Sequence, residues 1–270
     1  MKVSSLHIYP IKSLGGIELT TAILTPRGLK YDRRFMLTTS EGKFLTQRKI
    51  PTMALLKTKI VADDLIVWDS QQASDSLKFP IEPSQFLKEQ TVTIWKDTCT
   101  GSVMPANINE WFSSKLKQDC QLVYMADHSE RAIDAAYRKE GEIVSFADGY
   151  PILILGDEAL AVINKQAGEP IPANRFRANI LYKGGTAFEE DNWKDFTIGA
   201  ETFRGVKPCA RCNVPNINQE TAEKTIEPNR SLATFRRKDR KIYVGQNVCW
   251  EQQGEKEGII KVGDVIKMKN

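Results

Sequence analysis

Histidine is almost missing from this chain, because His7 and His128 are the only two among 270 residues. A Ser-His-Asp or Cys-His mechanism would have to use one of them. His7 lies in an alternating stretch that predicts a strand, and His128 lies in a polar stretch typical of a surface loop. The sequence also has no HExxH helix, no P-loop and no GxGxxG turn. The common hydrolase, NTPase and dinucleotide-binding signatures are therefore absent.

Long apolar runs are missing as well. No stretch of about 18 apolar residues occurs, so we expect no transmembrane helix. The first residues, MKVSSLHIYPIKS, contain no apolar leader, so we expect a cytoplasmic protein whose thiols stay reduced. The net charge of +4 is compatible with an anionic ligand or an acidic protein partner, although a diffuse solvated surface is the simpler interpretation. We expect no nucleic-acid and no membrane partner.

The composition suits a folded chain with a sizeable core, since 41% of the residues are hydrophobic and 27% are charged. We expect a domain boundary near residue 120, between segments 1–120 and 121–270. Short segments rich in β-branched and aromatic residues, separated by Gly, Asp, Ser and Pro, predict strands of a barrel or sandwich. These segments are residues 6–13, 18–25, 34–39, 44–48, 55–61, 65–70, 91–97, 178–185, 196–205, 241–253 and 259–268.

Two helices and one surface excursion complete the expected organisation. Residues 106–118 place Ile108, Phe112 and Leu116 on one helical face, and residues 156–168 end at a glycine that suits a helix stop. Residues 40–43, SEGK, predict a hairpin turn. Residues 126–142 are polar and charged, which is typical of a surface segment. The predicted class is mainly β with some helix (α+β).

The stretch GVKPCARCNVP contains the only close pair among five cysteines, Cys209 and Cys212. A structural zinc site normally needs four ligands, and no second pair exists. A thioredoxin-type dithiol would open a helix, which Pro215 disfavours. Two thiols without a chemical role form a third alternative, because free cysteine is commonly a small core residue. A single thiolate that holds a metal together with an organic cofactor is the fourth.

The fourth alternative requires donors for the cofactor's phosphate, and the sequence contains them. YPIKS and YDRRF place basic residues beside strands, and RFRAN places two arginines at alternate positions. Alternate residues of an extended segment point to one side, so the second arginine pair and the following asparagine can share a face. Arg211 flanks Cys212 and would favour its thiolate. The candidates are Lys12, Ser13, Arg33, Arg34, Arg175, Arg177 and Asn179.

YPIKS, YDRRF, FLTQRKIP, FADGYPILI, RFRANI, VKPCARC and IKVGDVI follow one another over nearly the whole chain. This ordered set resembles the MOSC family, in particular the mitochondrial amidoxime-reducing component and its bacterial relatives. The resemblance implies an N-terminal MOSC β-barrel domain packed on a MOSC β-barrel domain. It implies a molybdenum cofactor (molybdopterin) whose metal is held by one cysteine thiolate, and it brings an association with pyridoxal phosphate binding.

Carried over by motif, the resemblance implies that Cys212 is the molybdenum ligand and that Cys209 is a neighbour. Asp148 corresponds to an acidic residue near the metal that orients a water or relays a proton. The resemblance also implies which residues bind the pterin and its phosphate: Lys12, Ser13, Arg33, Arg177 and Asn179, with Arg175 as a further candidate. The implied activity is reduction of small N-oxygenated compounds with electrons from a separate ferredoxin, flavodoxin or haem/flavin reductase type of donor protein.

Two departures from the family pattern and two other functions stay open. This chain has NVPNIN after Cys212 where a threonine pair is common, and Ala178 where a proline is common. The first departure bears on substrate choice and the second on backbone stiffness. A sulfur carrier would use a persulfide on Cys212 and would need no bound pterin. A non-enzymatic interaction barrel would bind no metal and would tolerate loss of Cys212.

Overall fold

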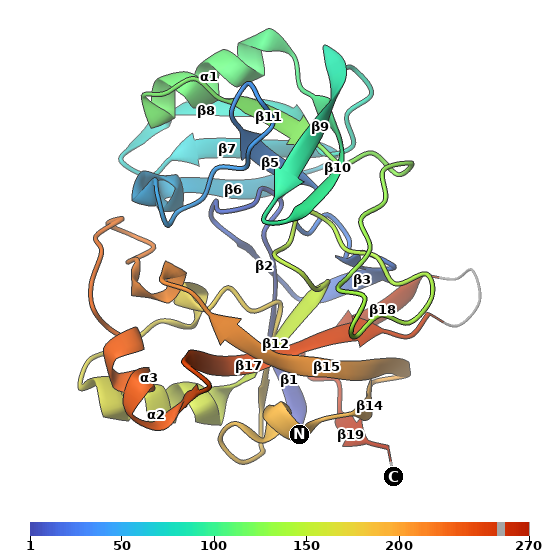
Figure 1. Cartoon of the computed structure of the whole chain (residues 1–270), viewed down its shortest axis with the longest axis vertical. Helices are drawn as coiled ribbons and strands as arrows, with labels where there is room; N and C mark the ends of the chain where they lie inside the picture. The colour runs from blue at the N-terminus through green and yellow to red at the C-terminus, as the bar shows by residue number, and fades with distance from the viewer. Residues whose placement is uncertain (253–256, 270) are drawn as a thin grey trace.

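The computed structural model describes residues 1–252 and 257–269. Its described residues are mainly strand, with three α-helices, which confirms the predicted α+β class. Figure 1 shows two parts stacked along the longest axis, with extended segments running between them. No helix in the described part of the chain is long and apolar enough to cross a membrane.

The lower part is built on a nine-stranded sheet in the order β19-β14-β15-β17-β12-β13-β1-β2, with β16 added to β17. Its neighbours are antiparallel except the parallel pair β12 and β13. Helices α2 (Asp157–Ala167) and α3 (Asn229–Phe235) accompany this sheet. The strands are β1 (Lys2–Ile8), β2 (Ile17–Leu19), β12 (Ile152–Gly156), β13 (Ile180–Lys183), β14 (Asp195–Ile198), β15 (Glu201–Arg211), β16 (Arg237–Lys238), β17 (Lys241–Trp250) and β19 (Ile266–Met268).

The upper part contains two smaller sheets and helix α1 (Ala106–Leu116). One sheet has the order β5-β11-β10-β9 and the other has the order β6-β7-β8. A third small sheet, β18-β3-β4, lies beside the large sheet of the lower part and shares its buried cluster through Leu24 and Ile260. The strands are β3 (Thr21–Thr25), β4 (Gly28–Leu29), β5 (Phe35–Thr38), β6 (Leu56–Val61), β7 (Asp64–Asp69), β8 (Gln72–Pro80), β9 (Lys88–Ile94), β10 (Asp97–Val103), β11 (Gln121–Tyr124) and β18 (Gly258–Lys261).

The strands are not grouped in space strictly by their order in the chain. Strand β1 pairs with β13 and β3 pairs with β18, so the N-terminal residues join sheets that C-terminal strands complete. Strand β11 lies on the other side of the expected boundary near residue 120, yet it pairs with β10 and β5. The division into 1–120 and 121–270 stays a prediction. The interleaving brings residues from both ends of the chain to the space between the two parts.

Both predicted helices are confirmed, and most predicted strands overlap an observed one. Helix α2 ends at Gly168 with φ of 70°, a left-handed value that glycine adopts without a side-chain clash. The predicted strand 44–48 is wrong beyond the bridge Thr38–Phe44, because the backbone turns through residues 47–49. Strand β8 was not predicted, since its mostly exposed, polar side chains lack an apolar alternation. Gln253, the last residue of predicted strand 241–253, lies outside the described residues.

Separate apolar clusters hold the two parts. Phe35, Phe112 and Leu122 belong to the buried cluster of the upper part, and Leu6, Phe196 and Val248 belong to the cluster of the large sheet. A third cluster packs α2 and α3 against the large sheet and includes Phe176. Because each part has its own hydrophobic core, the side chains between the two parts can be polar without loss of core packing.

Candidate functional site

A pocket opens between the upper and lower parts and holds about 850 Å³ of space, some of it continuous with solvent. Seven of the nine candidate residues named from the sequence line it: Lys12, Ser13, Arg33, Asp148, Arg177, Asn179 and Cys212. Its lining contains five cationic side chains and one carboxylate. The pocket is therefore strongly electropositive for its size, which suits an anionic ligand.

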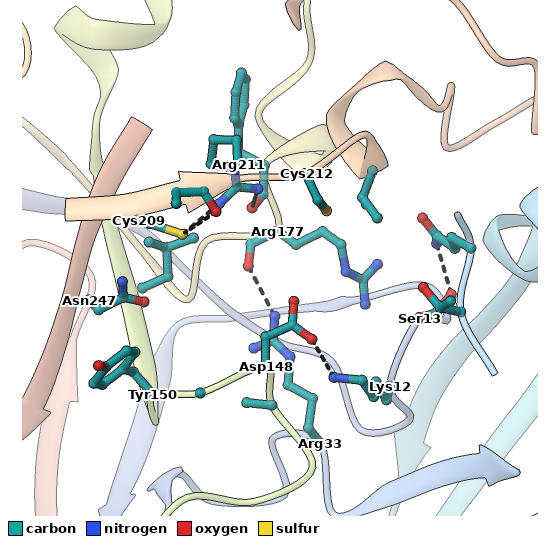
Figure 2. Close-up of a pocket in the computed structure, with 18 of the residues that line it drawn as sticks. Lys12, Ser13, Arg33, Asp148, Tyr150, Arg177, Cys209, Arg211, Cys212 and Asn247 are labelled. Atoms are coloured by element: carbon teal, nitrogen blue, oxygen red, sulfur yellow. Dashed lines mark hydrogen bonds and ion pairs between the residues drawn. The ribbon is translucent and has the colours of Figure 1, made fainter. Parts of the chain in front are cut away.

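The ion pair between Lys12 and Asp148 forms one wall (Figure 2). Lys12 is buried and its Nζ donates to Asp148 Oδ1 over 2.6 Å and to the carbonyl of Phe146 over 2.8 Å. Burial lowers the pKa of Lys12, and Asp148 acts in the opposite direction. Burial tends to raise the pKa of Asp148, but Lys12, Trp95 and Arg33 hold it well below its usual range. The Asp148 side chain is 67% exposed, so its ionised carboxylate faces the pocket.

Two arginines that line the pocket contact the ring of Tyr9, which itself lies outside the lining. The guanidinium carbon of Arg33 lies 4.5 Å from the ring centroid and that of Arg177 lies 4.2 Å from it. Arg33 is neutralised by the buried Asp32 at 2.6 Å, whereas no carboxylate pairs with Arg177 in the described chain. Burial, with a smaller contribution from nearby Arg33, lowers the pKa of Arg177 to about 10. The buried Nη2 of Arg177 has no hydrogen-bond partner among the described residues.

Four pocket residues adopt left-handed backbone conformations. The φ angles are 69° for Ser13, 49° for Arg33, 58° for Trp95 and 55° for Arg177. Such a conformation costs a residue other than glycine about 1 kcal/mol, and it is concentrated at ligand sites. The strained backbone aims the side chains of Arg33 and Arg177 at the same space.

The two neighbouring cysteines differ in their surroundings. Cys209 Sγ accepts a hydrogen bond from Arg211 Nη1 over 3.3 Å, and Arg211 Nη2 donates to the carbonyl of Phe176 over 2.7 Å. Arg211 therefore contacts Cys209 rather than Cys212, which corrects the prediction that it supports the Cys212 thiolate. Cys212 is half-buried and follows the end of β15, and no described residue hydrogen-bonds its sulfur. Figure 2 shows this sulfur on the same side as the Arg177 guanidinium.

Arg34 and Arg175 are the two candidates that do not line the pocket, and Arg34 instead donates to the carbonyl of Met125 and to Asp127. Residues 173–175 form a 3-10 turn and Arg177 is left-handed, so the expected extended segment is wrong. The Arg175 guanidinium instead donates to the carbonyl of Glu227 and to Thr225 Oγ1, both over 3.2 Å. Through these hydrogen bonds Arg175 stabilises the loop that follows Cys212. Asn179 lines the pocket, but its amide oxygen accepts from Arg33 over 3.2 Å and its amide nitrogen donates to the carbonyl of His7.

The other cysteines and both histidines lie outside the pocket. Burial raises the pKa of Cys99 to about 11 and that of Cys249 to about 12, so both stay protonated at neutral pH. Among residues 1–252 and 257–269, no three Cys, His, Asp or Glu side chains gather in a metal-binding cluster. The geometry thus offers no zinc centre there, and a metal at Cys212 would need most of its ligands from elsewhere.

Two known protein families match this chain. Residues 1–119 match the family described as the MOSC N-terminal beta barrel domain, and residues 141–267 match the MOSC domain. The chain belongs to the MOSC family. The two matches together cover most of the chain, and the pocket takes residues from both of them.

Named relatives of this MOSC chain fall into two groups. It is 28% identical to the molybdenum cofactor sulfurase of Oryza sativa subsp. japonica, over 95% of this chain and 34% of that protein. It is 29% identical to mitochondrial amidoxime-reducing component 1 of Mus musculus, over 98% of this chain and 81% of that protein. The chain spans about a third of the length of the sulfurases. The YuaD crystal structure from Bacillus subtilis reaches a TM-score of 0.38 at 10% identity over 98% of this chain and 93% of that one, too low to define a shared fold.

Three further residues shape the MOSC pocket that the sequence did not single out. Arg131 is buried, although it lies in the predicted surface excursion, and it donates to the carbonyls of Ser145, Ala147 and Asp148. Trp95 donates from Nε1 to Asp148 Oδ1 over 3.2 Å, and the Arg48 guanidinium stacks 3.9 Å from the Trp95 ring centroid. In the sequence, Arg131 is a single arginine in a polar segment, and nothing local distinguishes it from a surface residue. Only its contacts with residues 145–148 show that it supports the pocket.

Proposed function

We propose that this chain binds a molybdenum cofactor in the pocket, with Cys212 as the protein's metal ligand, and reduces N-oxygenated compounds. The observation that carries the proposal is the unpaired, buried Arg177 guanidinium in the same pocket as the open Cys212 sulfur. An uncompensated buried cation is costly and is normally retained for an anionic partner. Relatives named for an amidoxime-reducing component support the reductase, and both groups of relatives support the link to a molybdenum cofactor.

The donor set fits a phosphate-bearing cofactor with a soft metal. Arg177 would bind the phosphate through charge-assisted hydrogen bonds, and Arg33 and Lys12, although each is paired with a carboxylate, would add N–H donors at the edges of the site. Ser13 has a left-handed backbone and lines the same wall. Cys212 supplies a thiolate, the ligand type that soft metals prefer. Asn179 positions Arg33 by accepting its hydrogen bond and would act on the cofactor only indirectly.

When bound, the cofactor would supply a metal centre that exchanges two electrons and removes oxygen from nitrogen. In the overall reaction the N–O bond breaks, and two electrons and two protons convert the substrate to its N-reduced product and water. The Asp148 carboxylate is ionised at neutral pH, so alone it is a poor proton donor. Lys12 Nζ holds a proton 2.6 Å away, and its pKa is lowered by burial. We therefore assign Lys12 Nζ as the proton donor at the pocket and Asp148 as the ionised carboxylate that orients it.

Electrons would come from a separate redox protein, and a reduced thiol ligand fits a cytoplasmic location. A sulfur-carrier function is the alternative, supported by the likeness to the sulfurases and by the open Cys212 sulfur. In that case Cys212 would carry a persulfide and the cations would bind the acceptor's phosphate.

The decisive experiment uses protein made in a molybdate-supplied host. Molybdenum and released pterin are quantified for the wild type, for Cys212→Ala and for the matched control Cys209→Ala, and benzamidoxime reduction is followed with a small artificial electron donor. We expect near-stoichiometric pterin and turnover in the wild type and in Cys209→Ala, and loss of turnover in Cys212→Ala. Wild type without pterin but with a sulfane sulfur on Cys212 would establish the carrier function. Full inactivation by Cys209→Ala with normal metal in Cys212→Ala would refute the choice of thiol.

A further inference from the structure

A hairpin beside the pocket carries an exposed group of basic residues. Strand β16, the turn that follows it and the start of β17 contribute Arg237, Lys238, Arg240 and Lys241, which we call the basic hairpin. All four side chains are exposed, and none has an ion-pair partner in the described part of the chain. The preceding Arg236 differs, because it is paired with Asp191. The four free charges are thus available to a partner.

Two local features of the basic hairpin are unfavourable in the isolated chain. Lys238 and Lys241 are direct cross-strand partners, and like charges in that position repel. Asp239 and Arg240 form the connecting turn with φ angles of 48° and 63°. The second position of such a turn is normally glycine, so arginine there costs about 1 kcal/mol. The hairpin therefore keeps several positive charges at its tip although they destabilise it locally. Such a cost is expected where a function requires the charges.

The basic hairpin is also placed close to the cysteine end of β15. Ile242 of β17 is the register partner of Arg237 on one side and of Arg211 on the other. Two strand spacings, about 10 Å, therefore separate the backbone of Arg237 from that of Arg211. Figure 1 shows β15 and β17 side by side across the lower part, with α3 at one end. A protein seated on the hairpin would lie next to the strand whose end carries Cys209 and Cys212.

A shallow hollow next to the hairpin adds apolar contact surface. Its lining includes Lys207, Arg237 and Lys238 together with the aromatic rings of Tyr137, Phe235 and Tyr243. Phe235 is 38% exposed and Tyr137 is 42% exposed. Aromatic side chains within a basic rim are the composition of a protein-binding surface. Asp191 in the hollow is paired with Arg236, so the net charge of this surface stays positive.

We propose that the basic hairpin and this hollow form the docking surface for an acidic redox protein that delivers electrons to the Cys212 pocket. This inference rests on the proposed function, which needs two electrons from a separate protein. Charge complementarity would steer the encounter and orient the donor, with the aromatic side chains at the centre of the contact. One-electron carriers such as ferredoxins would bind twice in each turnover, which favours a weak, rapidly exchanging and salt-sensitive contact.

The test compares two triple charge reversals. Arg237→Glu with Lys238→Glu and Arg240→Glu removes the surface, and its fold is protected because Glu at 238 faces Lys241. Lys88→Glu with Lys261→Glu and Lys267→Glu is the matched control, since these lysines are exposed, unpaired in the described chain and outside the hollow. The probe is a plant-type [2Fe–2S] ferredoxin, with a flavodoxin as a second acidic protein. Their dissociation constants with the cofactor-free chain are measured at about 50 and 300 mM salt.

We expect the hairpin variant to bind the probes at least about tenfold more weakly than the wild type, and the control variant to bind as the wild type does. With loaded enzyme, kcat/KM for reduced ferredoxin should fall by a similar factor, while turnover with a small artificial donor stays unchanged. Equal binding by the hairpin variant, an equal loss in the control, or no binding of either probe would overturn the inference. Tighter binding of a single-stranded oligonucleotide than of ferredoxin would do so as well. Absence of turnover with the artificial donor refutes the proposed function instead, and the binding result still reports on the surface.

Discussion

Lys12 Nζ lies 2.6 Å from the carboxylate of Asp148, although 136 residues separate the two in the chain. The contact joins the segment after β1 to the segment before β12, and so it connects the two matched MOSC regions across the pocket. Lys12 is buried and Asp148 faces the pocket, so the pair presents one negative edge to any bound substrate.

Asp148→Asn tests the electrostatic part of this contact. Because the folded-state pKa of Asp148 lies below its unfolded value near 3.8, the ionised carboxylate stabilises the fold above that pH. The contribution is lost as the pH falls through the folded pKa. The exposed carboxylate limits the effect to about 1 kcal/mol at pH 7. In urea unfolding, the difference between wild type and variant should be full above about pH 4 and shrink below it. A difference that grows in acid would contradict this linkage.

Arg177→Met tests whether the unpaired guanidinium is retained for a ligand. In the ligand-free chain the lost cation–π contact is offset by removal of a desolvated charge, so the free energy of unfolding should change by less than about 1 kcal/mol. Inorganic phosphate should raise the melting temperature of the wild type and leave that of the variant unchanged. A loss of several kcal/mol without phosphate would instead make Arg177 a structural residue.

Arg175→Met is the natural counterpart, since Arg175 has three hydrogen-bond acceptors and does not line the pocket. Its loss leaves the carbonyl of Pro215 without a donor, although that of Glu227 keeps Thr225 Oγ1, and should lower the free energy of unfolding by about 2 kcal/mol. Stabilisation by phosphate should persist. If phosphate protection disappears here but persists in Arg177→Met, the assignment of the two arginines must be exchanged.

Arg131→Met should destabilise the chain by about 3 kcal/mol, because it breaks a buried charge network with Asp97 and three carbonyls. Arg131→Lys should recover little, since one ammonium cannot reproduce the planar fork. Hydrogen exchange should show faster exchange at residues 145–149, the segment that positions Asp148. Protection in that segment equal to wild type would show that it is held by other contacts.

Gly16→Ala probes the Tyr9 ring that lies between the two arginines. A methyl group at position 16 would lie 2.5 Å from Tyr9 Cε1 and 2.8 Å from Cδ1, and the ring is buried. We expect overpacking to cost about 1–3 kcal/mol and to displace the ring from Arg33 and Arg177. A melting curve and a crystal structure of the variant check both effects. A melting temperature equal to that of wild type would show that the ring has room to move.

Local patterns were enough for much of the fold. Helix α2 follows from its apolar spacing and from Gly168 at its end, and β6 and β7 follow from β-branched alternation. The strand predicted over 44–48 failed because Thr46 and Gln47 turn inward to the pocket, and nothing in five residues distinguishes that path from an extended one. Strand β8 is held by pairing with β7 rather than by its own composition.

By itself the sequence determined which chemical groups are present: one close cysteine pair, a lysine after β1, arginines in YDRRF and RFRAN, and no histidine where a metal or nucleophile would need it. Each motif is a short run of neighbouring residues, so its chemical groups can be identified from the sequence without knowledge of the fold. Only the tertiary structure decided that Arg177 faces the pocket while Arg175 braces a loop, that Arg211 contacts Cys209, and that Arg131 is buried beneath Asp148. Those outcomes depend on left-handed backbone turns and on contacts between residues far apart in the chain, and side-chain direction follows from such packing rather than from sequence spacing.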